Sequence, residues 1–198
     1  MGTKLIFITG GARSGKSDFA EGLARAHPGP VAYIPTATIS DPEMARRVEL
    51  HRQRRPAHWL TVECGDSLAQ TLSETAEHAA CLVVDCLTIY LVRLLPPDLP
   101  DAGAVAPELL AAVEQRVEQE MAAVEQSCRA SNSDIIVVSN EVGDGLVPAY
   151  PSGRLFRDAV GRANRSLAAA ADHAYLIVAG CPLDLKAKPP LLPWEVEP

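Results

Sequence analysis

Two short segments of the chain contain the residue types and the spacing that phosphate chemistry requires. The first segment consists of Gly10, Gly11, Ala12, Arg13, Ser14, Gly15, Lys16 and Ser17. It matches G-x-x-x-x-G-K-[ST] between an apolar run and a helical pattern, which is the context the motif needs. Glycines let the backbone N–H groups point at phosphate oxygens, and Lys16 adds a cation at the positive end of the following helix. We therefore predict nucleoside triphosphate binding here; the alternative is a glycine turn with a surface lysine.

A carboxylate that helps to hold Mg²⁺ is expected at the end of a neighbouring strand. Asp85 closes the apolar run CLVVD, so its side chain should emerge at the tip of a buried strand. Mg²⁺ takes hydroxyl and carboxylate oxygens beside those of the phosphates, so we predict Ser17 and Asp85 as its protein ligands. A helix-capping role for Asp85 is the alternative. The chain has no N-K-x-D motif for guanine, which disfavours a signalling GTPase.

The second segment, residues 46–59, reads RRVELHRQRRPAHW and holds five arginines and two histidines. A helix over 41–54 is predicted, with an Asp-Pro start and an end just before an Arg-Pro pair. Arg47, His51 and Arg55 recur at four-residue spacing and share a face of that helix. Small anionic ligands are the partners that such a local concentration of arginine favours.

His51 lies among cations, and nearby positive charge disfavours the imidazolium form. We predict a neutral, nucleophilic imidazole, beside guanidinium groups that neutralise the phosphate oxygens it would approach. Such a histidine is suited to attacking phosphorus and carrying a phosphoryl or nucleotidyl group covalently. A surface helix with a packing histidine is the alternative.

Short β-branched runs that alternate with helical patterns provide the scaffold for these residues. Strands are expected at 4–9, 31–35, 60–64, 81–86, 134–140 and 174–180, and helices near 16–26, 41–54, 66–78, 87–95, 105–130 and 153–171. Several strands are apolar on both faces. The pattern predicts an α/β, P-loop NTPase-like fold, with a mostly parallel central sheet flanked by helices on both faces.

Composition limits the class of protein. The chain has 198 residues, 47% of them hydrophobic, and a net charge of −7. We expect one nucleotide-binding catalytic domain over 1–186 and a Pro-rich tail over 187–198, which docks or frays. The acidic balance disfavours nucleic-acid and membrane-surface partners, and the apolar runs are too short for membrane insertion. Without a signal-peptide pattern, and with five scattered cysteines expected as free thiols, a cytoplasmic location is predicted.

The motifs as a set resemble one family. They are GGARSGKSDFAE, IPTAT, EMARRVELHRQRRPAHWLTVE, VVDCLT, VVSNEVGDGLVP and FRDAVGRANRSLAAAAD, and they span about residue 4 to Lys186. Together they resemble the bifunctional adenosylcobinamide kinase/adenosylcobinamide-phosphate guanylyltransferase of cobalamin biosynthesis. The resemblance implies two reactions. A nucleoside triphosphate, ATP or GTP, phosphorylates adenosylcobinamide; GTP then passes GMP through an enzyme histidine to the phosphorylated corrinoid, which gives adenosylcobinamide-GDP and pyrophosphate.

The resemblance also assigns residues. The guanylylated histidine falls on His51, with His58 as the other candidate, and Lys16 acts in catalysis. Beyond residues 10–17, the nucleotide contacts it implies are Pro35, Thr36, Ala37, Arg52, Gln53, Arg54, Arg55, Glu63 and Asp85. For Glu63 two roles stay open, reading the donor edge of guanine or orienting the metal's water. A homotrimer with shared sites is implied as well.

Some features depart from the family pattern or leave alternatives open. Asp85 stands where some relatives have Glu, Pro35 replaces a small residue, and Val92 and Arg93 stand where relatives often show polar residues. Residues 139–148 form either a substrate loop, with Glu141 as base or metal helper, or a plain turn.

The helix expected at 153–171 carries Arg154, Arg157 and Arg165, whose guanidinium groups either bind phosphate or are solvated. For the whole chain, the rival functions are a P-loop kinase of another small metabolite without guanylyltransferase activity, and a nucleotide-binding regulator.

Overall fold

A seven-stranded sheet forms the centre of the computed structural model, which describes residues 3–37, 46, 53, 55–97, 99 and 105–187. Its strand order is β3-β2-β4-β5-β1-β6-β7. The strands are β1 (Leu5–Gly10), β2 (Val31–Pro35), β3 (Leu60–Thr61), β4 (Cys81–Asp85), β5 (Asp134–Val138), β6 (His173–Val178) and β7 (Cys181–Asp184). Every pairing among β1 to β6 is parallel, and β7 runs antiparallel to β6. The predicted mostly parallel sheet is confirmed.

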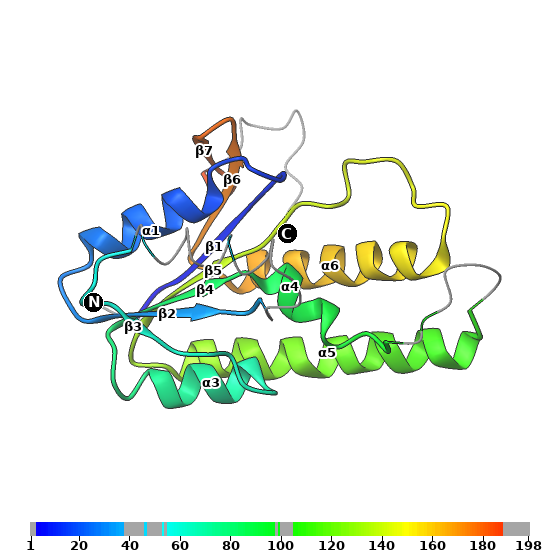
Figure 1. Cartoon of the computed structure of the whole chain (residues 1–198), viewed down its shortest axis with the longest axis horizontal. Coiled ribbons are helices and arrows are strands. Elements are labelled where there is room, and N and C mark those ends of the chain that lie inside the picture. Colours follow the sequence, from blue (N-terminus) through cyan, green and yellow to red (C-terminus); the bar gives the residue numbers. More distant parts are fainter. Residues whose placement is uncertain are drawn as a thin grey trace, which may run out of the picture.

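Helices cover both faces of the sheet, as predicted, but unequally (Figure 1). They are α1 (Lys16–Ala26), α3 (Leu68–Thr75), α4 (Leu87–Val92), α5 (Pro107–Ala130) and α6 (Pro151–Ala170). On one face α1 packs Ala20 and Ala24 against strand residues such as Ile8. On the other face, α3 to α6 pack against alternate strand residues such as Phe7. Since both faces of β1, β2, β4 and β5 are covered, these strands are buried and apolar along most of their length.

Local signals in the sequence explain the helix ends. Pro107 and Pro151 begin α5 and α6 at a position where the missing N–H costs nothing. The Ser67 side chain accepts a hydrogen bond from the Gln70 N–H and so caps α3. The predicted helices outside residues 41–54 are therefore confirmed, with ends that differ by up to three residues.

Two strand predictions need correction. β3 was expected over 60–64 but comprises only Leu60–Thr61, so Glu63 lies beyond its end rather than closing it. The Val62 N–H still donates to the Tyr33 carbonyl (2.9 Å), after which the chain leaves the sheet. The antiparallel strand β7 was not expected at all. It follows a tight turn at Ala179 and Gly180, which have φ of 52° and 82°, and CPLD lacks an alternating apolar pattern.

The predicted helix over 41–54 lies almost entirely outside the described residues; Arg46 and Gln53, which lie inside them, are helical. Of the tail over 187–198, only Ala187 is described. No described helix combines the length and the apolar character that crossing a bilayer requires.

Candidate functional site

The segment between β1 and α1 forms a tightly curled loop at the carboxyl edge of the sheet. Gly10 has φ 151°, and a Cβ there would lie 2.4 Å from the Ile177 carbonyl oxygen, so the position accepts only glycine. The loop is held from two sides. The Gly180 N–H donates to the Ser14 carbonyl (2.8 Å), and the Glu141 N–H donates to the Gly10 carbonyl (2.9 Å).

Lys16 points its ammonium group into this loop. The residue is buried, and its Nζ donates to the Gly11 carbonyl at 2.6 Å. Burial lowers the Lys16 pKa, while Cys86 and Asp85 act in the opposite direction. The Ser14 hydroxyl is buried and has no hydrogen-bond partner among the described residues. A phosphate oxygen would satisfy it and share the lysine charge, so the loop fits a nucleotide phosphate.

The end of β2 holds the end of β4, where Asp85 lies. Pro35 is the register partner of Asp85 in this parallel pair. Next, the Thr36 N–H donates to the Asp85 carbonyl (3.1 Å). The Thr36 hydroxyl donates to the Cys86 carbonyl (2.6 Å) and accepts from the Cys86 N–H (2.9 Å). The Asp85 carboxylate in turn accepts a hydrogen bond from the Tyr33 hydroxyl through Oδ2 (2.8 Å). The backbone at Asp85 is therefore held by Thr36, and its carboxylate is oriented by Tyr33.

These groups fit Mg²⁺ bound together with a triphosphate. β5 alone separates β1 from β4, and parallel strands end at the same edge, so Ser17 at the start of α1 and Asp85 belong to one site. Both are half-buried, and Oδ1 of Asp85 has no hydrogen-bond donor among the described residues. Mg²⁺ is commonly held by one or two such ligands plus phosphate oxygens and waters. Within the described ranges, no group of three or more His, Cys, Asp or Glu forms a separate metal site.

Arg55 connects the arginine-rich segment to this site. Its guanidinium carbon lies 3.6 Å from the centroid of the Tyr33 ring, a cation–π contact. Burial and the adjacent Asp85 raise the pKa of Tyr33 above its ordinary value, and Arg55 partly opposes them. Since Tyr33 also binds Asp85, the last arginine of the segment is two contacts from the proposed metal ligand. The predicted nucleophile, His51, lies outside the described residues, as do Arg52 and Arg54.

A second set of polar residues orders the chain after β5. The Ser139 hydroxyl donates to Oδ1 of Asn164 (2.6 Å) and lies 3.2 Å from the Thr88 hydroxyl. The Asn140 N–H donates to the Thr88 hydroxyl (2.6 Å), and Nδ2 of Asn164 donates to the Asn140 carbonyl (2.9 Å). This network joins α4, β5 and α6 directly behind Glu141, which contacts the phosphate loop. The segment is thus anchored at its start, whereas Leu146 is 97% exposed.

The structure brings most of the predicted residues together at this edge, with exceptions. Residues 10–17, Pro35, Thr36 and Asp85 converge, and Ala37 follows directly. Glu63 is exposed and makes no hydrogen bond or ion pair with a described residue. At a spacing of about 4.8 Å, four strand intervals separate its strand from β1 by roughly 19 Å. Gln53 and His58 are exposed.

The departure at Arg93 has a structural explanation. Its guanidinium donates to the Gly65 carbonyl at 2.8 Å and to the Cys64 carbonyl at 3.3 Å. The side chain therefore ties α4 to the segment that leads from β3 into α3. Val92, by contrast, is 48% exposed.

Sequence reasoning missed Tyr33, Thr88, Ser139 and Asn164. A signal existed for Tyr33: a tyrosine in a buried strand needs a partner for its hydroxyl. A signal existed for Ser139 as well, because polar residues that follow a buried strand mark the carboxyl edge of a parallel sheet. Thr88 and Asn164 lie inside helical patterns, where nothing distinguishes them.

Comparison with known proteins gives consistent matches over nearly the whole chain. The sequence profile described as cobinamide kinase / cobinamide phosphate guanyltransferase matches residues 6–185. The bifunctional adenosylcobalamin biosynthesis protein CobP of Pseudomonas aeruginosa is 42% identical over 182 residues, 92% of this chain and 97% of that protein. CobU of Salmonella typhimurium is 39% identical over 184 residues, and CobU of Escherichia coli 38% over 189; each alignment covers 92% of this chain and 99% of the relative.

Proposed function

The chain belongs to the cobinamide kinase / cobinamide phosphate guanyltransferase family, and from that premise we propose that it catalyses both reactions in the family's description. It phosphorylates adenosylcobinamide with a nucleoside triphosphate and then transfers GMP from GTP to the product. The observation that carries the proposal is the curled loop at residues 10–17 with Lys16 inside it. Asp85 ends β4, which only β5 separates from β1 and its loop.

In the kinase step, an acceptor hydroxyl attacks the γ-phosphorus of ATP or GTP. A P–O bond forms to the acceptor, the bond to the β-phosphate oxygen breaks, the nucleoside diphosphate leaves, and the hydroxyl proton goes to solvent or to a base. The loop N–H groups and Lys16 offset the charge on the phosphate oxygens during this transfer. Glu141 remains a candidate base because its N–H donates to the loop residue Gly10.

In the transferase step, we assign the nucleophile to His51. Its imidazole nitrogen attacks the α-phosphorus of GTP, a P–N bond forms, and pyrophosphate leaves with the electron pair of the broken P–O bond. An oxygen of the phosphorylated acceptor then attacks the same phosphorus, the P–N bond breaks, and the imidazole is regenerated. Arg55 supports this assignment, because it lies four residues after His51 and contacts Tyr33 beside Asp85.

Ser17 and Asp85 are the residues we propose for Mg²⁺, which when bound supplies positive charge to the phosphate oxygens. Arg52, Gln53 and Arg54 are proposed nucleotide contacts by resemblance. For Glu63 we favour the guanine-reading role, since the third strand is distant from the phosphate loop.

We also propose a single catalytic domain, a cytoplasmic location and a homotrimer. All five cysteines are free thiols, which supports a reducing compartment. Sedimentation equilibrium would test the trimer, which requires three times the 21.1 kDa mass of one chain.

Incubation with α-labelled GTP tests the function directly. We expect label on the protein that is acid-labile and alkali-stable, as a phosphoramidate is, and that is lost in His51→Ala. His58→Ala is the matched control, because its imidazole is exposed in a turn past the helix-ending proline. The labelled protein should transfer GMP to added adenosylcobinamide phosphate.

The outcomes separate the rival functions. Wild-type protein that phosphorylates cobinamide but never acquires label would be a kinase alone. Protein that binds nucleotide and turns over no corrinoid would be a regulator. Label that persists in His51→Ala and disappears in His58→Ala would move the nucleophile to the second histidine.

A further inference from the structure

A cavity of about 320 Å³ lies between α6 and the segment that follows β5. It is lined by Gly143, Arg157, Asp158, Gly161, Arg162 and Arg165. Arg157, Gly161 and Arg165 recur every four residues, so they lie on one face of α6. Gly161 leaves the middle of that face open, because a Cβ added there would meet no atom within 4 Å. The guanidinium groups of Arg157 and Arg165 therefore flank the open stretch of helix at Gly161, one on each side.

The charges in this cavity are only partly compensated. Arg162 pairs with Glu114 on α5 (2.8 Å), and a guanidinium nitrogen of Arg157 donates a long hydrogen bond to the Gly145 carbonyl (3.5 Å). Arg165 forms no hydrogen bond or ion pair with any residue in the described ranges. Asp158 is exposed and is the one acid among the lining residues. The cavity thus has more positive than negative charge in a chain whose net charge is −7.

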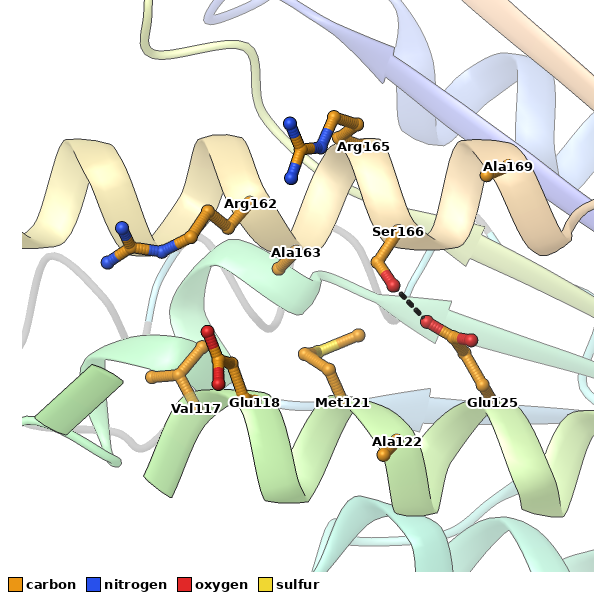
Figure 2. A pocket seen from close by; sticks show the side chains of 10 residues that line it. All are labelled: Val117, Glu118, Met121, Ala122, Glu125, Arg162, Ala163, Arg165, Ser166 and Ala169. Atoms are coloured by element: carbon orange, nitrogen blue, oxygen red, sulfur yellow. Dashed lines mark hydrogen bonds between the residues drawn. The ribbon is translucent and has the colours of Figure 1, made fainter. Parts of the chain in front are cut away.

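Neighbouring acids do not neutralise Arg165. Figure 2 shows its guanidinium projecting from the side of α6 away from α5. Glu118 and Glu125 line the groove between the two helices, which Arg165 also borders, but neither acid forms an ion pair with Arg165. Glu125 accepts a hydrogen bond from the Ser166 hydroxyl and lies 3.8 Å from Arg129.

The cavity is connected to the phosphate loop by a short chain of contacts. Gly143 lines the cavity, and its N–H donates to Oε1 of Glu141 (2.7 Å). Glu141 in turn donates its own N–H to the Gly10 carbonyl (2.9 Å). On the helix, the residue before Arg165 is Asn164, which is bonded to the start of the same segment. Two hydrogen bonds through Glu141 therefore join the cavity to Gly10 of the phosphate loop.

We propose that this cavity binds the phosphate monoester of the second-step acceptor, with Arg157 and Arg165 as its charged ligands. The inference rests on the proposed function, which makes the product of the kinase step the substrate of the transferase step. A phosphate monoester carries close to two negative charges at neutral pH, and two guanidinium groups bind such a group more strongly than they bind a hydroxyl. The cavity would therefore bind the phosphorylated corrinoid more tightly than the unphosphorylated one.

Two kinds of variant test the cavity in different ways. Arg165→Gln removes a charge, and Gly161→Leu fills the cavity without removing one. Arg116→Gln on the exposed face of α5 is the control for the first. Gly22→Leu is the control for the second, because Gly22 is also a helical glycine with open space around its Cβ position.

Three rates are measured for each variant: phosphorylation of adenosylcobinamide, labelling by α-labelled GTP without acceptor, and transfer to adenosylcobinamide phosphate. We expect the KM for adenosylcobinamide phosphate to rise at least about tenfold in both cavity variants, since each removes or blocks a charge-assisted hydrogen bond. The first two rates should stay within about twofold of wild type. An unchanged KM in both variants overturns the proposal, and so does an equal loss in GTP labelling, which would assign the cavity to the nucleotide.

Equilibrium dialysis of the coloured corrinoids separates this inference from the proposed function. Without nucleotide, wild-type protein should retain adenosylcobinamide phosphate at least about tenfold better than adenosylcobinamide, and Arg165→Gln should lose the preference. If wild-type protein prefers adenosylcobinamide phosphate but turns over no corrinoid, the binding proposal holds and the proposed function is refuted. If it turns over both corrinoids but shows no binding preference, the proposed function holds and the binding proposal is refuted.

Discussion

The guanidinium of Arg55 stacks on the ring of Tyr33, whose hydroxyl donates to the carboxylate of Asp85. Tyr33 is thereby a positioning residue that joins the arginine-rich segment to the proposed metal ligand. The ring and the hydroxyl serve different partners, so substitution can separate their effects.

Tyr33→Phe keeps the ring for Arg55 and removes the hydroxyl from Asp85. We expect the free energy of unfolding to fall by about 1.5 kcal/mol, because a hydrogen bond to a charged group is lost. The Mg²⁺ concentration for half-maximal kinase activity should rise, since Asp85 loses the contact that orients it. Arg55→Met is the matched variant: it removes the cation–π contact and should leave the Mg²⁺ dependence much closer to wild type. Identical Mg²⁺ dependence in Tyr33→Phe and wild type would contradict a positioning role.

Gly10→Ala should disrupt the phosphate loop. An added Cβ would meet the Ile177 carbonyl oxygen at 2.4 Å, and φ of 151° is unfavourable for alanine. We expect a loss of about 2–4 kcal/mol in the free energy of unfolding, measured by denaturant titration, together with loss of nucleotide binding. Gly11→Ala is the control for stability, because its Cβ position is open, and it should change stability by less than about 0.5 kcal/mol. Equal stability of the two variants would refute the packing argument.

Lys16 should make nucleotide affinity depend on pH. Burial lowers its pKa, so the ammonium becomes neutral at a pH below the ordinary value of 10.5. We expect ATP affinity, measured by calorimetry, to fall as the pH rises through that lowered pKa, and Lys16→Met to abolish this dependence.

The lowered pKa of Lys16 affects folding stability in the opposite direction: stability rises with pH, whereas ATP affinity falls. Protonated Lys16 opposes folding below its lowered pKa, and this effect disappears as the pH rises to the unfolded value. At neutral pH, Lys16→Met should therefore be no less stable than wild type, although it binds ATP about 100-fold more weakly. A marked loss of stability would show that the Gly11 contact outweighs burial.

Ser139→Ala should weaken the network behind Glu141. Ser139 is fully buried, and its replacement leaves Oδ1 of the buried Asn164 without its 2.6 Å donor. We expect a loss of about 1–3 kcal/mol in unfolding free energy. Ser73→Ala, on the exposed side of α3, should stay within about 0.5 kcal/mol of wild type. If the two variants are equally stable, the network does not hold the segment in place.

Local patterns were sufficient to predict the parallel sheet, the phosphate loop and the position of Asp85. Each depends on short-range features: apolar runs, glycines at fixed offsets and a lysine at a helix start. β7 was missed because CPLD has no alternating pattern, and its pairing depends on the turn at Ala179 and Gly180. The shortness of β3 was missed because its end is set where the chain turns away after Val62, not by residue type.

The contacts that complete the site are long-range, and single-sequence reasoning has no access to them. Tyr33 and Asp85 are 52 residues apart, and Ser139 and Asn164 are 25 apart. The arginines of α6 are a second example in which tertiary packing, not the local sequence, determines the surroundings of a residue. In the sequence Arg165 resembles any solvated helix residue, and only the packing of the segment after β5 against α6 places it beside a cavity.

The hydrogen bond between Lys16 and the Gly11 carbonyl restrains the lysine side chain. A long lysine side chain has up to about 2 kcal/mol of rotational entropy to lose, and here much of that loss accompanies folding. An incoming triphosphate consequently meets an immobilised cation that exchanges one oxygen partner for another. Burial of this charge lowers the stability of the loop. In exchange, less side-chain entropy is lost when the triphosphate binds.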